Sequence, residues 1–224
     1  SRLGRFFEGM LVAGAGNSFD ILSFHAYTFW YTPGQPPLGD SRDWRIAYLN
    51  GLLTRYNASI KPMIRTEAAL LCVTITPECR WAQADLVGRM FARTMRDGLL
   101  ATIWYVYDSD SYHNTALIEP GDVFVPRPAY FAYRHAAKLL NDAKFVSAVA
   151  GLPAGVEGYA FRRQSSLVYI FWTDQGGEVP VPLKVAPERP VACSDRAGAP
   201  LTCPREGEWI WLSVGQGPVY VVVD

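Results

Sequence analysis

The chain has 224 residues, half of them hydrophobic and 13% aromatic, so it can bury a substantial core and is not expected to be disordered. Lys and Arg together number 21, as do Asp and Glu, and this balance argues against nucleic acid or an acidic membrane as a partner. No apolar run approaches the roughly 20 residues that span a bilayer, so no membrane partner is expected.

Strands and helices are expected to alternate over residues 1–142. Short apolar runs bounded by loops predict buried parallel strands at 19–27, 61–67 and 101–108. Apolar residues at helical spacing predict helices at 42–56, 76–97 and 128–141. A β-α-β-α-β-α order is typical of parallel sheets, whose ligands bind at the carboxyl ends of the strands.

The pattern changes after about residue 143. Short segments such as "LVYIFWT" and "EWIWLSV" are separated by turn signals such as "DQGG" and "RAGAP", and most of them alternate with a period of two. Residues 143–224 are therefore expected to form an antiparallel β-sandwich. Its tryptophans, Trp172, Trp209 and Trp211, are expected in the core or between domains, with a carbohydrate-binding surface as the alternative.

Four cysteines allow three pairings. Closure over short sequence distances favours Cys72 with Cys79 and Cys193 with Cys203. Two disulfides would place the protein in an oxidising compartment, secreted, extracellular or periplasmic. The alternative is four unpaired thiols in a cytosolic protein.

Three side chains stand near the carboxyl ends of the predicted strands: His25, Glu67 and Trp104. Since side chains alternate along a strand, Arg65 should share the face of Glu67, and Thr102 the face of Trp104. We expect these faces to point toward a ligand and the intervening residues to contact helices. The alternative roles are a carboxylate at a helix N-terminus for Glu67, a hydrogen-bonded core histidine at position 25 and a core indole at position 104.

The strings "FDILSFHAY", "KPMIRTE" and "ATIWYVYD", followed by "RPAYFAYRHAAKLL" and a β-sandwich, resemble the second half of a clan A glycoside hydrolase. These enzymes are retaining (β/α)8 barrels. The resemblance implies that residues 1–142 hold barrel strands six to eight, and that the chain is the C-terminal portion of such an enzyme. It also implies an O-glycosyl hydrolase that cleaves β-linked glycosides or polysaccharide without a cofactor or metal.

By the same resemblance Glu67 is the nucleophile. His25 and Tyr27 flank it, with Tyr27 donating a hydrogen bond to its carboxylate, and Trp104 forms an aromatic floor under the sugar. Trp30 and Asp108, in loops after strands, are further candidates for contacts with an oligosaccharide or polysaccharide. Their alternative roles are packing for Trp30 and a solvated loop for Asp108.

The sequence departs from the family pattern in one respect. In this clan the acid/base is a Glu, usually after an Asn, at the end of strand four, and no Asn-Glu pair occurs here. A full barrel takes roughly 250 residues. The N-terminal half is therefore expected as a separate chain or a missing segment, and a truncated, inactive remnant is the alternative explanation. The rival function is a non-catalytic carbohydrate-binding or structural module derived from such a barrel.

Overall fold

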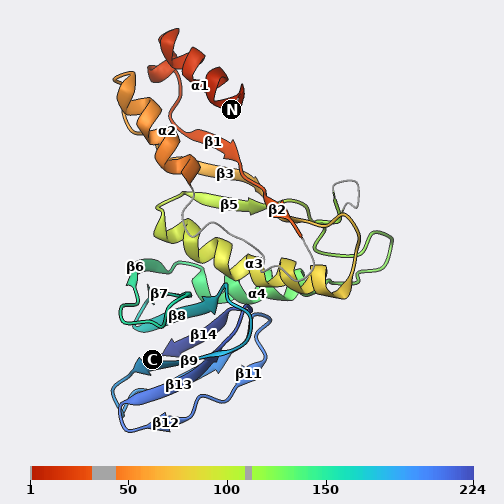
Figure 1. The fold of residues 1–224 in the computed structure, drawn as a ribbon, viewed down its shortest axis with the longest axis vertical. Coiled ribbons are helices and arrows are strands. Elements are labelled where there is room, and N and C mark those ends of the chain that lie inside the picture. The colour runs from red at the N-terminus through yellow and green to blue at the C-terminus, as the bar shows by residue number, and fades with distance from the viewer. Residues whose placement is uncertain (1, 32–43, 109–112) are drawn as a thin grey trace.

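The computed structural model describes residues 2–31, 44–108 and 113–224, without the side chains of 2–4 and 28–30. Helices and parallel strands alternate up to residue 140, as Figure 1 shows in its upper half. The elements are α1 (Arg2–Val12), the 3-10 helix η1 (Ala15–Asn17), β1 (Leu22–His25), β2 (Thr28–Trp30), α2 (Trp44–Arg55), β3 (Met63–Ala68), β4 (Leu70–Leu71), α3 (Pro77–Arg96), β5 (Ala101–Trp104) and α4 (Pro128–Leu140).

The central sheet of this part has the order β1-β3-β5 and is parallel throughout. The three strands and three helices fall where the sequence predicts them, although β5 ends at Trp104, four residues early. Residues 42 and 43 of the predicted second helix lie outside the described residues. The sequence did not predict β2 and β4, because strands this short show no period. They form a separate two-stranded parallel pair.

The helices cover one face of the parallel sheet. Leu52 and Leu53 of α2 pack with Met63 of β3 in a buried cluster that Leu22 and Phe24 of β1 extend. On the opposite face, Ile21 and Ile103 are each 49% exposed. Within the described residues, the parallel sheet therefore has one covered face and one open face.

The second half of the chain forms two antiparallel sheets that pack face to face. One has the order β11-β10-β14-β8-β7-β6 and the other the order β12-β13-β9. Phe171, Val181, Ile210 and Val221 belong to the buried cluster between them, as the alternating pattern predicts. The strands are β6 (Lys144–Ala148), β7 (Val156–Arg163), β8 (Ser166–Thr173), β9 (Val179–Lys184), β10 (Val191–Ser194), β11 (Pro200–Leu201), β12 (Arg205–Glu206), β13 (Trp209–Val214) and β14 (Val219–Val223).

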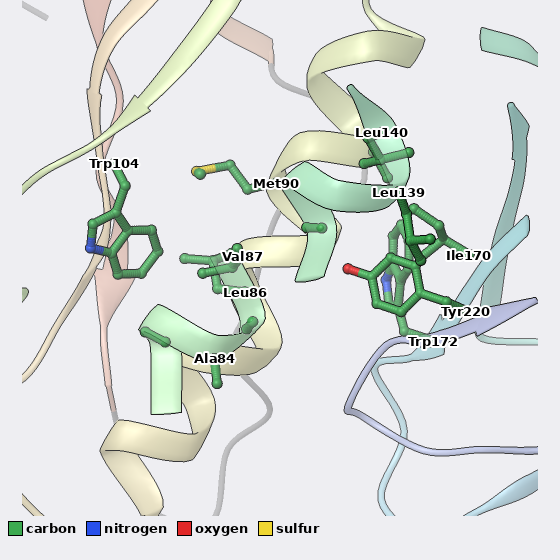
Figure 2. Packing of buried hydrophobic residues seen from close by; sticks show 14 of the residues in the cluster. Ala84, Leu86, Val87, Met90, Trp104, Leu139, Leu140, Ile170, Trp172 and Tyr220 are labelled. Carbon is green, nitrogen blue, oxygen red and sulfur yellow. The ribbon is translucent and has the colours of Figure 1, made fainter. Parts of the chain in front are cut away.

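Helices α3 and α4 form a layer between the parallel sheet and the six-stranded sheet (Figure 1). Figure 2 shows that Val87 and Met90 of α3 lie between Trp104 on one side and Trp172 and Tyr220 on the other. One buried cluster thus joins both halves of the chain. This explains why α3 is buried around most of its circumference rather than along one stripe.

Partly buried ion pairs also connect α3 to the sandwich. Arg89 is fully buried, and its Nη1 donates to Asp174 Oδ1 at 2.6 Å, while its Nη2 donates to the Gln216 carbonyl. Arg196 Nη1 donates to Asp85 Oδ1 at 2.6 Å. Burial lowers the pKa of the Arg89 guanidinium, and the carboxylates of Asp174 and Asp85 oppose that shift. The guanidinium therefore needs these partners to remain buried as a cation.

Candidate active site

The candidate site is built at the carboxyl end of β3, the middle strand of the parallel sheet. The carboxyl ends of parallel strands meet at one edge, so residues distant in the sequence are brought together there. Phe24 pairs with Arg65, but the next residue, His25, pairs with Glu67, and Thr66 is skipped. This extra residue in β3 is a bulge, and a bulge redirects the side chains that follow it.

Two groups contact one oxygen of the Glu67 carboxylate. The Tyr27 hydroxyl donates a hydrogen bond to Oε2, and His25 Nδ1 lies 3.2 Å from the same atom. The Glu67 side chain is 28% exposed and that of His25 is 56% exposed, so the carboxylate is held in place but remains accessible. A carboxylate in this setting can act as a nucleophile or a base toward a molecule on the open face of the sheet.

Tyr105, which the sequence reasoning did not select, also lies at this end of the sheet. Its ring meets that of Tyr27 edge to face, with centroids 6.5 Å apart and planes at 87°. Its backbone N–H donates at 3.0 Å to the carbonyl of Ala68, the residue that follows Glu67. Alternation could have indicated Tyr105, because Tyr105 lies on the face opposite to that of Trp104.

The predicted facing of Trp104 is wrong. Trp104 is 6% exposed and lies on the helix-facing side of β5, next to Val87 and Met90 (Figure 2). Its indole N–H donates to the Thr115 carbonyl at 2.8 Å. Thr102 faces the same way, with its hydroxyl 2.6 Å from that of Thr94 in α3. Alternation identifies which residues share a face but not which face meets the helices, and the large indole gains more by burial.

Arg65 likewise does not share the face of Glu67. It is 7% exposed, and its guanidinium carbon lies 5.8 Å from the ring centroid of Phe24, on the helix side. The prediction assumed strict alternation along β3, and the skipped residue at Thr66 breaks it.

Trp30 and Asp108 are the remaining residues that the sequence predicts to contact the sugar chain. Trp30 ends β2, beside Leu71 of β4, and its side chain is outside the described part of the chain. Asp108 is exposed in the bend after β5. Within the described residues no group of His, Cys, Asp and Glu is arranged to hold a metal ion.

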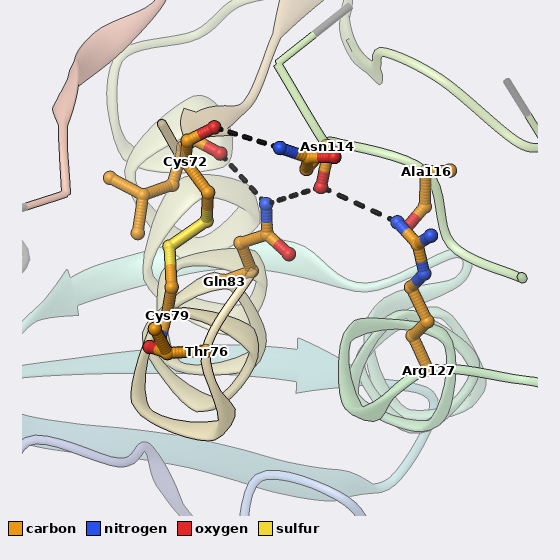
Figure 3. The surroundings of a disulfide bond; sticks show 8 residues. Cys72, Thr76, Cys79, Gln83, Asn114, Ala116 and Arg127 are labelled. Atoms are coloured by element: carbon orange, nitrogen blue, oxygen red, sulfur yellow. Dashed lines mark hydrogen bonds between the residues drawn. A yellow bond between two sulfur atoms is a disulfide. The ribbon is translucent and has the colours of Figure 1, made fainter. Parts of the chain in front are cut away.

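A disulfide, the buried Gln83 and the partly buried Asn114 tie together the loops around this edge (Figure 3). Cys72 is bonded to Cys79, at the start of α3. Asn114 Nδ2 donates to the Cys72 carbonyl at 3.1 Å, and Gln83 Nε2 donates to the carbonyls of Leu70 and Asn114 at 2.9 and 3.0 Å. The loops after β3 and β5 are thus held to α3, which fixes the surroundings of Glu67.

Arg127 extends this support to the segment before α4. It is 2% exposed, and its Nη1 donates to the Ala116 carbonyl at 3.3 Å while its Nη2 pairs with Glu119 at 2.8 Å. Arg80 of α3 lies 2.6 Å from the same carboxylate.

The second disulfide, Cys193–Cys203, lies in the sandwich. Both disulfides join the cysteines that the sequence pairs, and they fit an oxidising compartment.

No protein-family model and no curated protein matches the sequence. Solved structures match the fold. A family 39 glycoside hydrolase from the gut symbiont Bacteroides cellulosilyticus is 21% identical, with a TM-score of 0.75 over 96% of this chain and 46% of that protein. A glucosidase from Croceicoccus marinus is 12% identical, with a TM-score of 0.68 over 96% and 56% of the two chains. The chain therefore shares its fold with glycoside hydrolases.

A family 30 endoxylanase from Clostridium papyrosolvens gives a TM-score of 0.58 at 14% identity, over 95% of this chain and 50% of that one. At such identities the likeness concerns the fold. The chain spans about half the length of these solved structures. Within the described residues, no helix is long and apolar enough to cross a membrane.

Proposed function

We propose that this chain supplies the nucleophile side of a retaining glycoside hydrolase, with Glu67 as the nucleophile. One observation carries the proposal: Tyr27 and His25 hold the same oxygen of a single accessible carboxylate at the carboxyl end of the middle strand. Ligand chemistry in barrels of this kind is placed at that end. The fold shared with glycoside hydrolases is the second support.

In the proposed reaction, the carboxylate oxygen of Glu67 that does not face Tyr27 attacks the anomeric carbon of a β-linked sugar. A C–O bond to Glu67 forms, the glycosidic C–O bond breaks, and the leaving oxygen takes a proton from a second carboxylic acid. That second group then removes a proton from water, which attacks the anomeric carbon and releases Glu67. The hydrogen bond from Tyr27 and the 3.2 Å contact with His25 Nδ1, both to Oε2, orient the carboxylate for the first step.

The second carboxylic acid and the rest of the barrel are proposed to lie outside this chain, on a separate chain or on a further segment of the polypeptide. The open face of the parallel sheet supports this, because Ile21 and Ile103 are each 49% exposed there. Retention requires the two carboxyl groups to be about 5–5.5 Å apart. The missing part must therefore place its acid directly across the open face from Glu67.

The proposed substrates are β-linked glycosides or polysaccharides. The matched structures include a β-xylosidase, an endoxylanase and a glucosidase, so β-xylosides and β-glucosides are the first to test. Asp108 and Trp30 remain proposed contacts for the sugar chain. We also propose that residues 1–142 and 143–224 are the two domains, and that the protein is secreted, extracellular or periplasmic.

A substitution with rescue tests the role of Glu67, in the protein assembled with the part that completes the barrel. Glu67→Ala should abolish hydrolysis of an aryl β-glycoside that wild type cleaves. Added azide should restore release of the aryl group and give a glycosyl azide of inverted configuration, because azide attacks from the side that Glu67 vacated. A product of retained configuration, or full activity without azide, would contradict the assignment.

The rival reading is a non-catalytic module with the shape of a barrel. It predicts sugar binding without turnover in every variant. Glu67→Gln separates the two readings, since it removes the nucleophile and keeps the size of the side chain. In the enzyme, this change should abolish turnover and leave sugar binding within a few fold of wild type. Equal loss of both would count against a nucleophile at this position.

A further inference from the structure

The outer face of the three-stranded sheet in the sandwich presents two tryptophans to solvent. Along β13, Ile210 and Leu212 point into the core, whereas Trp209 and Trp211 are 41% and 40% exposed. This sheet lies at the end of the molecule farthest from α1, on the far side of the sandwich from the helices (Figure 1). The expectation that both indoles lie in the core or between domains is therefore wrong. Trp172 alone is fully buried, as expected.

The two indoles form a row with defined neighbours. Trp209 pairs across the sheet with Lys184 of β9 and Glu206 of β12, and Trp211 pairs with Pro182 of β9. Residues two apart on a strand are separated by roughly 6.5–7 Å along one face. We call Trp209, Trp211 and Pro182 the indole platform. It is an apolar strip along one strand with polar side chains at its edges.

Two pairs of polar side chains lie around the platform. Lys184 Nζ lies 2.9 Å from Glu208 Oε1 and 5.9 Å from the ring centroid of Trp209. The Ser213 hydroxyl, next along the same face, donates to Glu178. Lys184 offsets Glu208, while the carboxylates of Glu206 and Glu178 keep their charge, so the surroundings of the platform are weakly acidic and disfavour an anionic partner. These side chains do leave hydrogen-bonding groups within reach of a neutral molecule that lies on the indoles.

The platform is too small for a protein partner. Two fifths of each indole side chain gives roughly 100 Å² apiece, about 200 Å² in total, from an area of 150–250 Å² per aromatic side chain. A standard interface needs about 800 Å² from each partner. Strand addition at the β9 edge is also disfavoured, because prolines 180 and 182 lack the backbone N–H that a new strand would use.

Because the strip runs straight along one strand, we propose that the indole platform binds an extended chain of β-linked pyranose sugars at a site separate from Glu67. A pyranose ring has an apolar face of C–H bonds, which matches an exposed indole, and hydroxyls at its rim, which match the surrounding polar side chains. A neutral ligand one ring wide suits a strip of this area and charge. The proposal goes beyond the glycosidase function and does not depend on it, since binding here involves none of the residues around Glu67.

Native affinity electrophoresis of the chain tests the proposal, with soluble arabinoxylan or hydroxyethylcellulose in the gel. Wild type should be retarded by at least one of the two polymers. Trp209→Ala/Trp211→Ala should lose at least tenfold in affinity, and Trp209→Phe/Trp211→Phe should lose less because each keeps an aromatic face. Trp44→Ala is the matched control, because Trp44 is 53% exposed on α2 and should leave retardation unchanged.

A second readout guards against a variant that fails to fold. Titration of wild type with xylohexaose or cellohexaose should shift the tryptophan fluorescence, and the single variants Trp209→Ala and Trp211→Ala should each reduce the response. Glu67→Gln should be retarded like wild type even if Glu67 proves to be the nucleophile. The proposal is wrong if neither polymer retards wild type, or if the double alanine variant is retarded as strongly as wild type.

Discussion

The sandwich and the parallel sheet differ in how much of their apolar surface this chain covers by itself. The sandwich encloses its own core between two sheets, with Phe171, Val181 and Val221 fully buried. The parallel sheet is covered by helices on one face, and its other face exposes Ile21 and Ile103. The difference separates two roles: the covered surfaces supply stability, and the open face carries the groups that can react.

This separation has a physical consequence. Burial of apolar side chains dominates the free energy of folding, so most of that free energy must come from the sandwich and from the helix layer beneath it. The side chains of Glu67 and His25 are 28% and 56% exposed and are polar, so they add little to this apolar burial. Substitutions on the two sides of the parallel sheet should therefore differ sharply in their effect on stability.

The largest effect is expected at Trp172, the fully buried indole that joins the helix layer to the sandwich. Trp172→Ala should lower the free energy of unfolding by about 3–5 kcal/mol, because it removes a large buried side chain and leaves a cavity. Urea denaturation followed by circular dichroism measures this loss. Trp44→Ala, on the exposed face of α2, is the control and should change the free energy by no more than about 0.5 kcal/mol. Similar losses in both variants would contradict the comparison.

The disulfide of the sandwich should have the next largest effect. Cys193 and Cys203 are ten residues apart in the sequence. Closing a loop of that length stabilises the folded state by about 2–3 kcal/mol in the chain-entropy model. Cys193→Ser/Cys203→Ser should lose that amount in urea denaturation. A variant as stable as wild type would show that the sandwich does not need this closure.

A smaller, pH-dependent effect is expected at His135, where α4 meets the sandwich. Its Nε2 lies 2.9 Å from the Ser194 hydroxyl, and its ring contacts that of Tyr220 edge to face. Burial lowers the pKa of His135, while Asp195 opposes and Lys138 assists that shift. The unfolded chain therefore binds a proton more readily, and the stability that neutral His135 contributes is present above about pH 6.5 and lost as the pH falls toward the lower folded value.

His135→Gln tests this dependence, because glutamine can still hydrogen-bond to Ser194 and does not titrate. Thermal denaturation of wild type and variant at pH 7.5 and 5.5 gives the comparison. The advantage of wild type over the variant should shrink at the lower pH. An advantage that grows with acidity would reverse the sign of the pKa shift.

The smallest effect is expected on the open face. Ile103→Ser should lower the free energy of unfolding of this chain by only about 1 kcal/mol, since half of the side chain is already exposed. Leu53→Ala provides the contrast, because Leu53 is fully buried in α2 against the covered face of the same sheet, and it should cost about 2–5 kcal/mol. Equal losses of stability in the two variants would show that some other part of the molecule than the one proposed already covers the face that carries Ile103.

The order of strands and helices could be predicted because it depends on local patterns. Thr76 illustrates this: its side chain accepts a hydrogen bond from the Cys79 N–H at 3.2 Å, and Pro77 begins α3, as the sequence indicates. The placing of His25 and Glu67 at one edge followed from the carboxyl ends of parallel strands meeting there, whereas Tyr27 was expected beside them from the family resemblance. The cysteine pairing followed from short sequence separation.

Which face each side chain takes could not be predicted in the same way. A bulge at Thr66 placed Arg65 and Glu67 on opposite faces, and no residue in β3 indicates that bulge in the sequence. Trp104 and Tyr105 are adjacent aromatic residues, so alternation alone could not decide which of them faces the helices. Trp209 and Trp211 were expected in the core because tryptophan is usually buried. Only the packing of the two sheets shows that these side chains of β13 face solvent.

The most direct test of the central claim is covalent trapping of Glu67 by a 2-deoxy-2-fluoro β-glycosyl fluoride. Fluoride leaves without a proton, so trapping depends on the nucleophile more than on the acid. In the protein assembled with the part that completes the barrel, mass spectrometry should find one fluorosugar added, on the peptide that contains Glu67, and none in Glu67→Gln. A label on another carboxylate, or turnover without any label at Glu67, would contradict the account.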